Sequence, residues 1–122
     1  MKILIVDDEL TVKRLFELRF RREIREGKVE LYFAYPGAQA LTMLGSEEMT
    51  DVAFILADIN MPWMSGLELL AKIRLEYPNK EIFMVTAYHD SNNREQALYL
   101  GATDYLIKPI NLKVLKEKLL SS

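Results

Sequence analysis

The chain has 122 residues and no cysteine, half of its residues are apolar, and its formal net charge is −2. This length is typical of one domain with its own core, and the lack of cysteine excludes disulfides, thiolate metal sites and a thiol nucleophile. The charge argues against nucleic acid or a membrane surface as the main partner, and no apolar run suits a signal peptide or a membrane span. We therefore expect a single cytoplasmic domain over residues 1–122.

The predicted elements alternate between strand and helix along the chain. Short apolar runs predict strands at 2–6, 29–34, 52–57, 81–86 and 104–108. Apolar residues at helical spacing predict helices at 10–26, 38–44, 67–75, 91–100 and 112–120, with Gly27 as a plausible cap of the first. Residues 46–51 are expected to be a polar link. This alternation predicts an α/β sandwich of three layers, with a parallel sheet between two layers of helices.

Polar side chains end or directly follow four of the five predicted strands. Functional groups of an open parallel sheet collect beyond the carboxyl ends of its strands. In chain order those ends carry Asp7 and Asp8, Asp58, Thr86, and Lys108. If the first and third strands are neighbours, three carboxylates meet, and their repulsion requires a cation. Oxygen ligands without histidine or cysteine favour a hard cation such as Mg²⁺, with Mn²⁺ as an alternative.

This set of side chains is suited to phosphoryl transfer. Carboxylates, Mg²⁺ and a lysine can neutralise the charge that builds on the phosphoryl oxygens during transfer. One carboxylate remains free to act as the nucleophile and to carry an aspartyl phosphate. Asp58 is the preferred nucleophile because it stands alone, whereas Asp7 and Asp8 are paired as metal ligands.

Four motifs of the chain closely resemble those of the receiver domains of bacterial two-component response regulators. They are VDDE at 6–9, DINMPWMSG at 58–66, VTA at 85–87 and GATDYLIKP at 101–109, in the order and spacing of that family. The resemblance implies a flavodoxin-like fold with strand order 2-1-3-4-5, the order of the chemotaxis member of the family. It also implies a signalling phosphoacceptor that slowly hydrolyses its own acyl phosphate, rather than an enzyme with steady turnover.

The resemblance implies a role for each matched residue of the acidic region. Asp58 would accept the phosphoryl group from a phosphohistidine on a sensor histidine kinase or a histidine phosphotransfer protein. Asp8 would bind Mg²⁺ directly, Asp7 would act mainly through water, and Asn60 would give its backbone carbonyl to the metal.

Further residues would bind the phosphoryl group or respond to it. Thr86, the backbone N–H of Ala87 and Lys108 would each contact phosphoryl oxygens. Tyr105 would be the switch aromatic that swings inward when Thr86 is drawn toward the phosphate. The resemblance also implies a cis peptide bond before Pro109.

Two positions are expected to tune hydrolysis of the acyl phosphate. Asn60 and Tyr88 would frame the path of the attacking water, and we hypothesise that the bulky Tyr88 ring slows that water. The surface of the fourth helix, fifth strand and fifth helix, residues 92–122, is expected to carry the signal. A downstream protein, an output domain on a longer chain or a second copy in a homodimer could receive it, without direct contact to nucleic acid or a membrane.

Other functions fit parts of the pattern. An FMN carrier of the same topology needs a phosphate loop after the first strand, where Asp7 and Asp8 would repel the FMN phosphate. A phosphatase of the haloacid-dehalogenase type needs an acid two residues after its nucleophile, where this chain has Asn60. A degenerate receiver would serve only as a protein-binding module. Taken singly, aspartates at strand ends usually cap turns.

Overall fold

The apolar runs of the sequence form one parallel sheet. The computed structural model describes residues 1–61, 64–86 and 91–120. The strands are β1 (Lys2–Val6), β2 (Glu30–Ala34), β3 (Val52–Asp58), β4 (Glu81–Thr86) and β5 (Asp104–Ile107). They lie in the order β2-β1-β3-β4-β5, and every neighbouring pair is parallel. The expected fold class and strand order are therefore confirmed, and β1 and β3 are neighbours.

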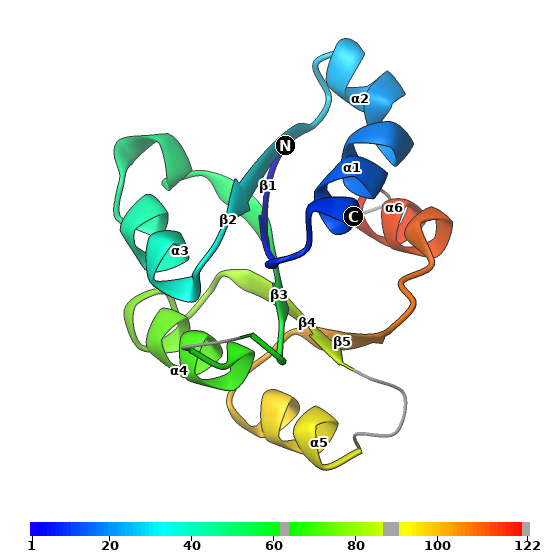
Figure 1. The fold of residues 1–122 in the computed structure, drawn as a ribbon. Coiled ribbons are helices and arrows are strands. Elements are labelled where there is room, and N and C mark those ends of the chain that lie inside the picture. The colour runs from blue at the N-terminus through cyan, green and yellow to red at the C-terminus, as the bar shows by residue number, and fades with distance from the viewer. Residues whose placement is uncertain (62–63, 87–90, 121–122) are drawn as a thin grey trace.

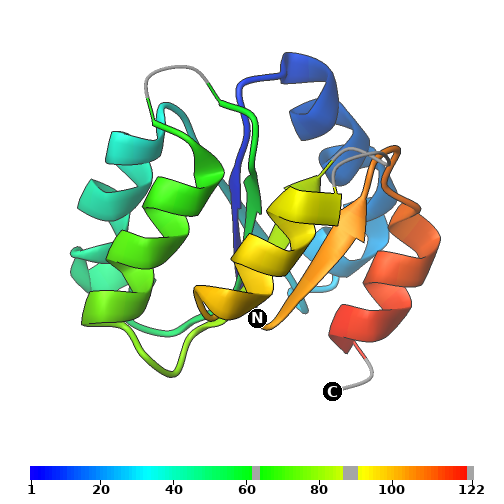
Figure 2. The same ribbon diagram turned by 90° about the horizontal axis from the view of Figure 1, so that it is seen from below.

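Helices cover both faces of this sheet (Figures 1 and 2). They are α1 (Leu10–Arg19), α2 (Arg21–Arg25), α3 (Gly37–Leu44), α4 (Gly66–Glu76), α5 (Ser91–Tyr99) and α6 (Leu112–Leu120), and the predicted link at 46–51 contains a short 3₁₀ turn, Glu47–Met49. One core cluster joins the sheet to α3, α4 and α5. A second joins the other face to α1 and α6. The expectation of three layers is confirmed.

The predicted first helix is not continuous. It breaks at Phe20, whose φ of −99° and ψ of 9° leave the helical region, and it resumes as α2. Phe20 is fully buried and its ring stacks on Phe16 at 6.0 Å between centroids. Glu23 of α2 is also buried and forms a 2.7 Å ion pair with Lys116 of α6. These tertiary contacts override the local helical pattern. Gly27, with φ of 74°, follows α2 in the left-handed conformation expected of a cap.

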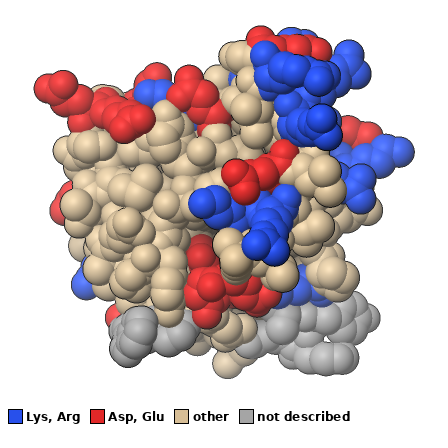
Figure 3. Space-filling view, turned by 45° about the horizontal axis from the view of Figure 1, so that its top comes forward, with Lys and Arg blue, Asp and Glu red and all other residues tan. Residues whose placement is uncertain are grey.

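Apolar residues of α1 and α2 at helical spacing are only partly buried. Leu10, Leu15, Leu18 and Ile24 are all exposed, so the core contact of this segment rests mainly on Phe16 and Phe20, with the partly buried Val12 packed beside them. Many of the residues between the four exposed apolar ones are exposed Arg, Lys or Glu. Lys and Arg side chains gather at the upper right of Figure 3. Among the described residues no helix is long and apolar enough to cross a membrane.

Arg74 fixes the loops at the opposite end of the sheet from the strand-end acids. Its guanidinium donates hydrogen bonds to the backbone carbonyls of Tyr77, Pro78 and Lys80, which follow α4, and of Gly101, which follows α5. Gly101 adopts a φ of 102°, which favours glycine. This one side chain therefore ties the end of α4 to the turn that leads into β5.

Candidate functional site

Asp58 is the last residue of β3 and only 2% of its surface is exposed. The apolar residues before it place it there, because they pair with β1 on one side and β4 on the other. The backbone N–H of Ile59 donates to the carbonyl of Val85 at 2.9 Å, which extends the pairing beyond the strand. A carboxylate therefore lies at the central strand end of a buried sheet, where it requires charged or polar partners.

Lys108 supplies the cationic partner of Asp58. It follows β5, and its backbone N–H donates to the carbonyl of Thr86 at 2.9 Å. The peptide bond to Pro109 is cis, as the resemblance implies, and so is the bond between Tyr35 and Pro36. The Lys108 ammonium donates to Oδ2 of Asp58 at 2.5 Å. Burial lowers the pKa of Lys108, but the hydrogen bond and charge of Asp58 outweigh it, so the net pKa is raised and the ammonium form is favoured.

The other side of Asp58 is acidic. One carboxylate oxygen from each of Asp7, Asp8, Glu9 and Asp58 lies within 4.8 Å of the others. The side chain of Asp7 accepts the backbone N–H of Glu9 at 2.9 Å. Even so, burial, aided by the nearby charge of Asp58, raises the pKa of Asp7 to about 6. Four oxygen donors at this spacing, one with a raised pKa, fit a hard divalent cation.

The turn after β3 is held close beneath Asp58. The backbone N–H of Asn60 donates to Oδ1 of Asp58 at 2.9 Å, and Gly66 donates its N–H to the carbonyl of Ile59 at 2.8 Å. A Cβ on Gly66 would lie 2.2 Å from the backbone oxygen of Asp58, so this close approach requires glycine. Ser65 accepts the N–H of Glu68 and caps α4. The turn therefore brings Asn60 beside the acidic cluster.

Thr86 lies at the end of β4 and is fully buried. Its hydroxyl finds no hydrogen-bond partner within the described ranges, which omit 87–90. Buried hydroxyls normally have partners, so the environment of this oxygen at the strand end bears on the function of the site. Tyr105 is half-buried on the neighbouring β5, where it pairs with Met84. Thr86 and Tyr105 thus lie on adjacent strands.

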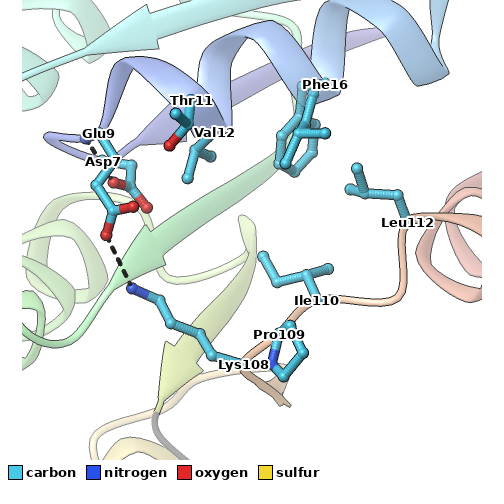
Figure 4. A pocket seen from close by; sticks show the side chains of 10 residues that line it. Asp7, Glu9, Thr11, Val12, Phe16, Lys108, Pro109, Ile110 and Leu112 are labelled. Atoms are coloured by element: carbon cyan, nitrogen blue, oxygen red, sulfur yellow. Dashed lines mark hydrogen bonds and ion pairs between the residues drawn. The ribbon is translucent and has the colours of Figure 1, made fainter.

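A cavity of about 410 Å³ opens beside these groups, between α1 and the loop that leads into α6. Figure 4 shows Lys108 pointing toward the carboxylates of Asp7 and Glu9 at one end of it. Apolar side chains line the rest: Val12, Leu15, Phe16, Ile110 and Leu112. The charged cluster is therefore continuous with an apolar hollow.

The structure brings most of the predicted site residues together and adds one. Asp7, Asp8, Asp58 and Lys108 lie in one cluster, with Asn60 and Thr86 at its edge. Ala87 and Tyr88 lie outside the described residues. Glu9 was missed as a site residue, although its carboxylate belongs to the cluster and lies 3.7 Å from the Lys108 ammonium. Its place in the acidic run at 7–9 was the signal that could have identified it.

The chain is similar to known proteins over nearly its whole length. Residues 3–120 match the family described as response regulator receiver domain. A chemotaxis protein CheY homolog from Campylobacter jejuni is 38% identical over 121 residues, covering 98% of this chain and 89% of that protein. A receiver domain protein from Clostridium thermocellum superposes with a TM-score of 0.85 at 25% identity, covering 98% of this chain and 91% of that one.

A further solved structure holds a receiver domain together with a partner. The receiver domain of the Saccharomyces cerevisiae response regulator Ssk1, crystallised with the histidine phosphotransfer protein Ypd1, has a TM-score of 0.81. It is 26% identical, and the match covers 98% of this chain and 86% of that one.

Proposed function

Since the chain belongs to the family of response regulator receiver domains of two-component systems, we propose that it is a phosphoacceptor that is phosphorylated on Asp58. The donor is a phosphohistidine on a sensor histidine kinase or a histidine phosphotransfer protein. The receiver domain spans residues 1–122 and acts in the cytoplasm. The observation that carries the proposal is the buried Asp58 carboxylate, bonded to Lys108 at 2.5 Å and adjoining a cluster of acidic oxygens.

Different residues around Asp58 would contact different oxygens of the transferred phosphoryl group. A bond forms between a carboxylate oxygen of Asp58 and phosphorus, while the phosphorus–nitrogen bond to the donor imidazole breaks and the imidazole takes up a proton. Lys108 already binds Oδ2 of Asp58, so its ammonium can follow the charge onto a phosphoryl oxygen. The buried Thr86 hydroxyl has no partner in the described part of the chain and can donate to a second oxygen. The backbone N–H of Ala87 would bind a third.

A divalent cation, Mg²⁺ with Mn²⁺ as an alternative, would be held by Asp7, Asp8, Asp58 and the backbone carbonyl of Asn60. When bound, it neutralises negative charge on the carboxylates and the phosphoryl oxygens. The donor set supports this choice because it contains only oxygen atoms. The pKa of Asp7, raised by burial and by the nearby charge of Asp58, also fits a site that would gain from a bound cation. The exposure of Asp8 and Glu9 leaves the cluster open to solvent.

Phosphorylation would be read out on the surface formed by α5, β5 and α6. Thr86 would move toward the phosphoryl group, and Tyr105 on the adjacent strand would turn inward. A downstream protein, an output domain on a longer chain or a second copy would then contact this surface. The complex of Ypd1 with the receiver domain of Ssk1 supports a phosphotransfer protein as one class of partner for the present chain.

The lifetime of the phosphorylated state would depend on Asn60 and Tyr88. If the Tyr88 ring slows the attacking water, Tyr88→Ala should speed loss of the acyl phosphate, measured by the decay of labelled protein after removal of the donor. An unchanged decay rate would show that Tyr88 does not control the water.

The phosphoacceptor role is tested with a small phosphodonor. We expect acetyl phosphate or phosphoramidate with Mg²⁺ to add the mass of one phosphoryl group to the intact protein. Asp58→Asn should abolish the addition, whereas Asp51→Asn, a matched change at an exposed acid, should not. Failure of the wild-type protein to react would favour a receiver that only binds partners. Yellow colour would favour the FMN carrier, and steady turnover of a phosphate ester would favour the phosphatase.

A further inference from the structure

Arg94 of α5 lies over the ring of Tyr105. Its guanidinium carbon is 5.5 Å from the ring centroid, within the range of a cation–π interaction. Both residues are half-buried, so the contact is partly shielded from water. A partly desolvated guanidinium on an aromatic face is bound more strongly than an exposed one. The sequence did not single out Arg94, because the contact joins α5 to β5 through the fold.

The register of the sheet connects this contact to Asp58. Tyr105 pairs with Met84, and Ile107 pairs with Thr86. Side chains of paired residues and of residues two apart on a strand point to the same face, so Tyr105 and Thr86 share one face of the sheet. Helix α5 covers that face, since its Ala97 is fully buried in the core cluster that contains Met84. Arg94 therefore lies on the helix that covers the sheet face shared by Tyr105 and Thr86.

One nitrogen of the Arg94 guanidinium lacks a hydrogen-bond partner in the described part of the chain. This nitrogen is Nε, and it is buried. A buried donor of this kind gains from any favourable electrostatic contact, and the negative face of the tyrosine ring provides one. Lys118 is another cation near Tyr105, but it forms an ion pair with Asp104, the residue before Tyr105.

We propose that Arg94 is a latch that holds Tyr105 in its position in the phosphoryl-free protein and thereby sets how readily the domain switches. This rests on the proposed function of Asp58 and Tyr105. If Tyr105 turns inward when Asp58 is modified, the ring leaves the guanidinium and the contact is lost. An interaction made only in the unmodified state opposes the change, and by linkage it weakens binding of any ligand that favours the switched state. Arg94 is thus a positioning residue that acts through Tyr105.

The test uses beryllofluoride with Mg²⁺, which mimics a phosphoryl group on a carboxylate. Arg94→Gln should bind beryllofluoride roughly two- to five-fold more tightly than wild type, the change expected from loss of a cation–π contact at a partly exposed site. Arg94→Lys, which keeps the charge, should change affinity less. Arg21→Gln, an exposed arginine of α2 with the same change in charge, should leave it unchanged.

A double-mutant comparison separates the latch from a general charge effect. In a Tyr105→Leu background, which has no ring, Arg94→Gln should no longer tighten binding. In a Tyr105→Phe background, which keeps the aromatic face, the gain should persist. Equal or weaker binding by Arg94→Gln, or a gain that persists with Tyr105→Leu, would overturn the proposal.

A second readout needs no ligand. In NMR spectra of the free protein, the side-chain protons of Arg94 should show an upfield shift from the Tyr105 ring, lost in Tyr105→Leu and reduced when beryllofluoride binds. Absence of this shift in the wild type would overturn the latch. If the wild type neither binds beryllofluoride nor is labelled on Asp58, the proposed function fails and the latch with it. If the wild type binds beryllofluoride and is labelled on Asp58 but the variants do not behave as expected, only the proposed role of Arg94 is wrong.

Discussion

The two sides of Asp58 are built in opposite ways. On one side the chain supplies its own counter-charge, because the Lys108 ammonium lies 2.5 Å from Oδ2 and also 3.7 Å from Glu9. On the other side Asp7, Asp8 and Glu9 bring carboxylates within 4.8 Å of one another and of Asp58, and burial raises the pKa of Asp7 to about 6. The charge of Asp58 is balanced within the protein on the lysine side, whereas the proposed function places a cation from solution on the acidic side.

The two sides also differ in access to solvent. Asp58 and Thr86 are buried, and the Lys108 side chain is 35% exposed. Asp8 and Glu9 are exposed. A metal ion can therefore enter from the acidic side without opening the core, while the lysine stays anchored on the buried carboxylate. Changes on the two sides should have opposite effects on stability.

The largest change in the free energy of unfolding is expected at Gly66, in the turn that follows Asp58. A Cβ there would lie 2.2 Å from the backbone oxygen of Asp58 and 2.6 Å from the Cα of Ile59. Gly66→Ala should therefore lower the free energy of unfolding by about 3 kcal/mol, the upper end of the usual cost of overpacking. Gly45→Ala is the control, since its nearest contact would be 3.5 Å and its φ is −78°. Urea denaturation that gives equal losses would contradict this picture of the turn.

Removing the Lys108 ammonium should cause the next largest loss of stability. Lys108→Met leaves the buried Asp58 carboxylate without its cation, which should cost about 2–3 kcal/mol of stability, less than for a fully buried pair because Lys108 is partly exposed. The matched change Lys118→Met breaks an ion pair to Asp104 in which both side chains are 40% exposed or more, and should cost under about 1 kcal/mol. Similar losses for the two variants in urea denaturation would show that Asp58 does not depend on Lys108.

A change on the acidic side should stabilise the metal-free protein. The pKa of Asp7 is about 6 in the folded chain, above its usual 3.8. Ionised Asp7 therefore lowers the free energy of unfolding above pH 6, and this destabilisation disappears as the pH falls below 3.8. Asp7→Asn should therefore raise stability at pH 7.5 by of order 1 kcal/mol, the full shift being discounted for a half-exposed group. Thermal unfolding should show the gain shrinking between pH 6 and 4.

Added Mg²⁺ should reverse the order of stability of the wild type and Asp7→Asn. A saturating concentration should stabilise the wild type more than Asp7→Asn, because ligands of the folded state stabilise it by mass action. A variant that remains the more stable of the two at high Mg²⁺ would argue that Asp7 takes no part in metal binding.

The smallest effect is expected from a change at Glu9, and it concerns the affinity for Mg²⁺. Its side chain is 54% exposed, so Glu9→Gln should weaken Mg²⁺ binding by only about two-fold, in line with exposed ionic interactions. A titration followed by the fluorescence of Trp63, the only tryptophan in the chain, measures it. Loss of binding comparable to that of Asp8→Asn would place Glu9 among the direct ligands.

The strand ends could be predicted from the sequence because local patterns determine them. The apolar run before Asp58 indicates a buried strand, and the topology of parallel sheets then brings Asp7, Asp58, Thr86 and Lys108 to one edge. Periodicity alone did not give the strand order, which came from the resemblance and is confirmed by the sheet.

Contacts between distant parts of the chain could not be predicted. Lys116 of α6 contacts the segment at the break, because it donates to the carbonyl of Arg19 and pairs with the buried Glu23. Local helical spacing contains no signal for either contact. Leu15 and Leu18 fit an amphipathic pattern but are exposed. The Arg94 contact with Tyr105 was missed for the same reason, since it depends on how α5 crosses β5.

The most direct test is to locate the phosphoryl group on the protein after reaction with acetyl phosphate. Intact mass followed by peptide mapping should find one phosphoryl group per chain, on Asp58, when Mg²⁺ is present and none when the divalent cation is chelated. Labelling of another residue such as His89, or equal labelling of Asp58 without a divalent cation, would contradict the division of the site into a lysine side and a metal-dependent acidic side.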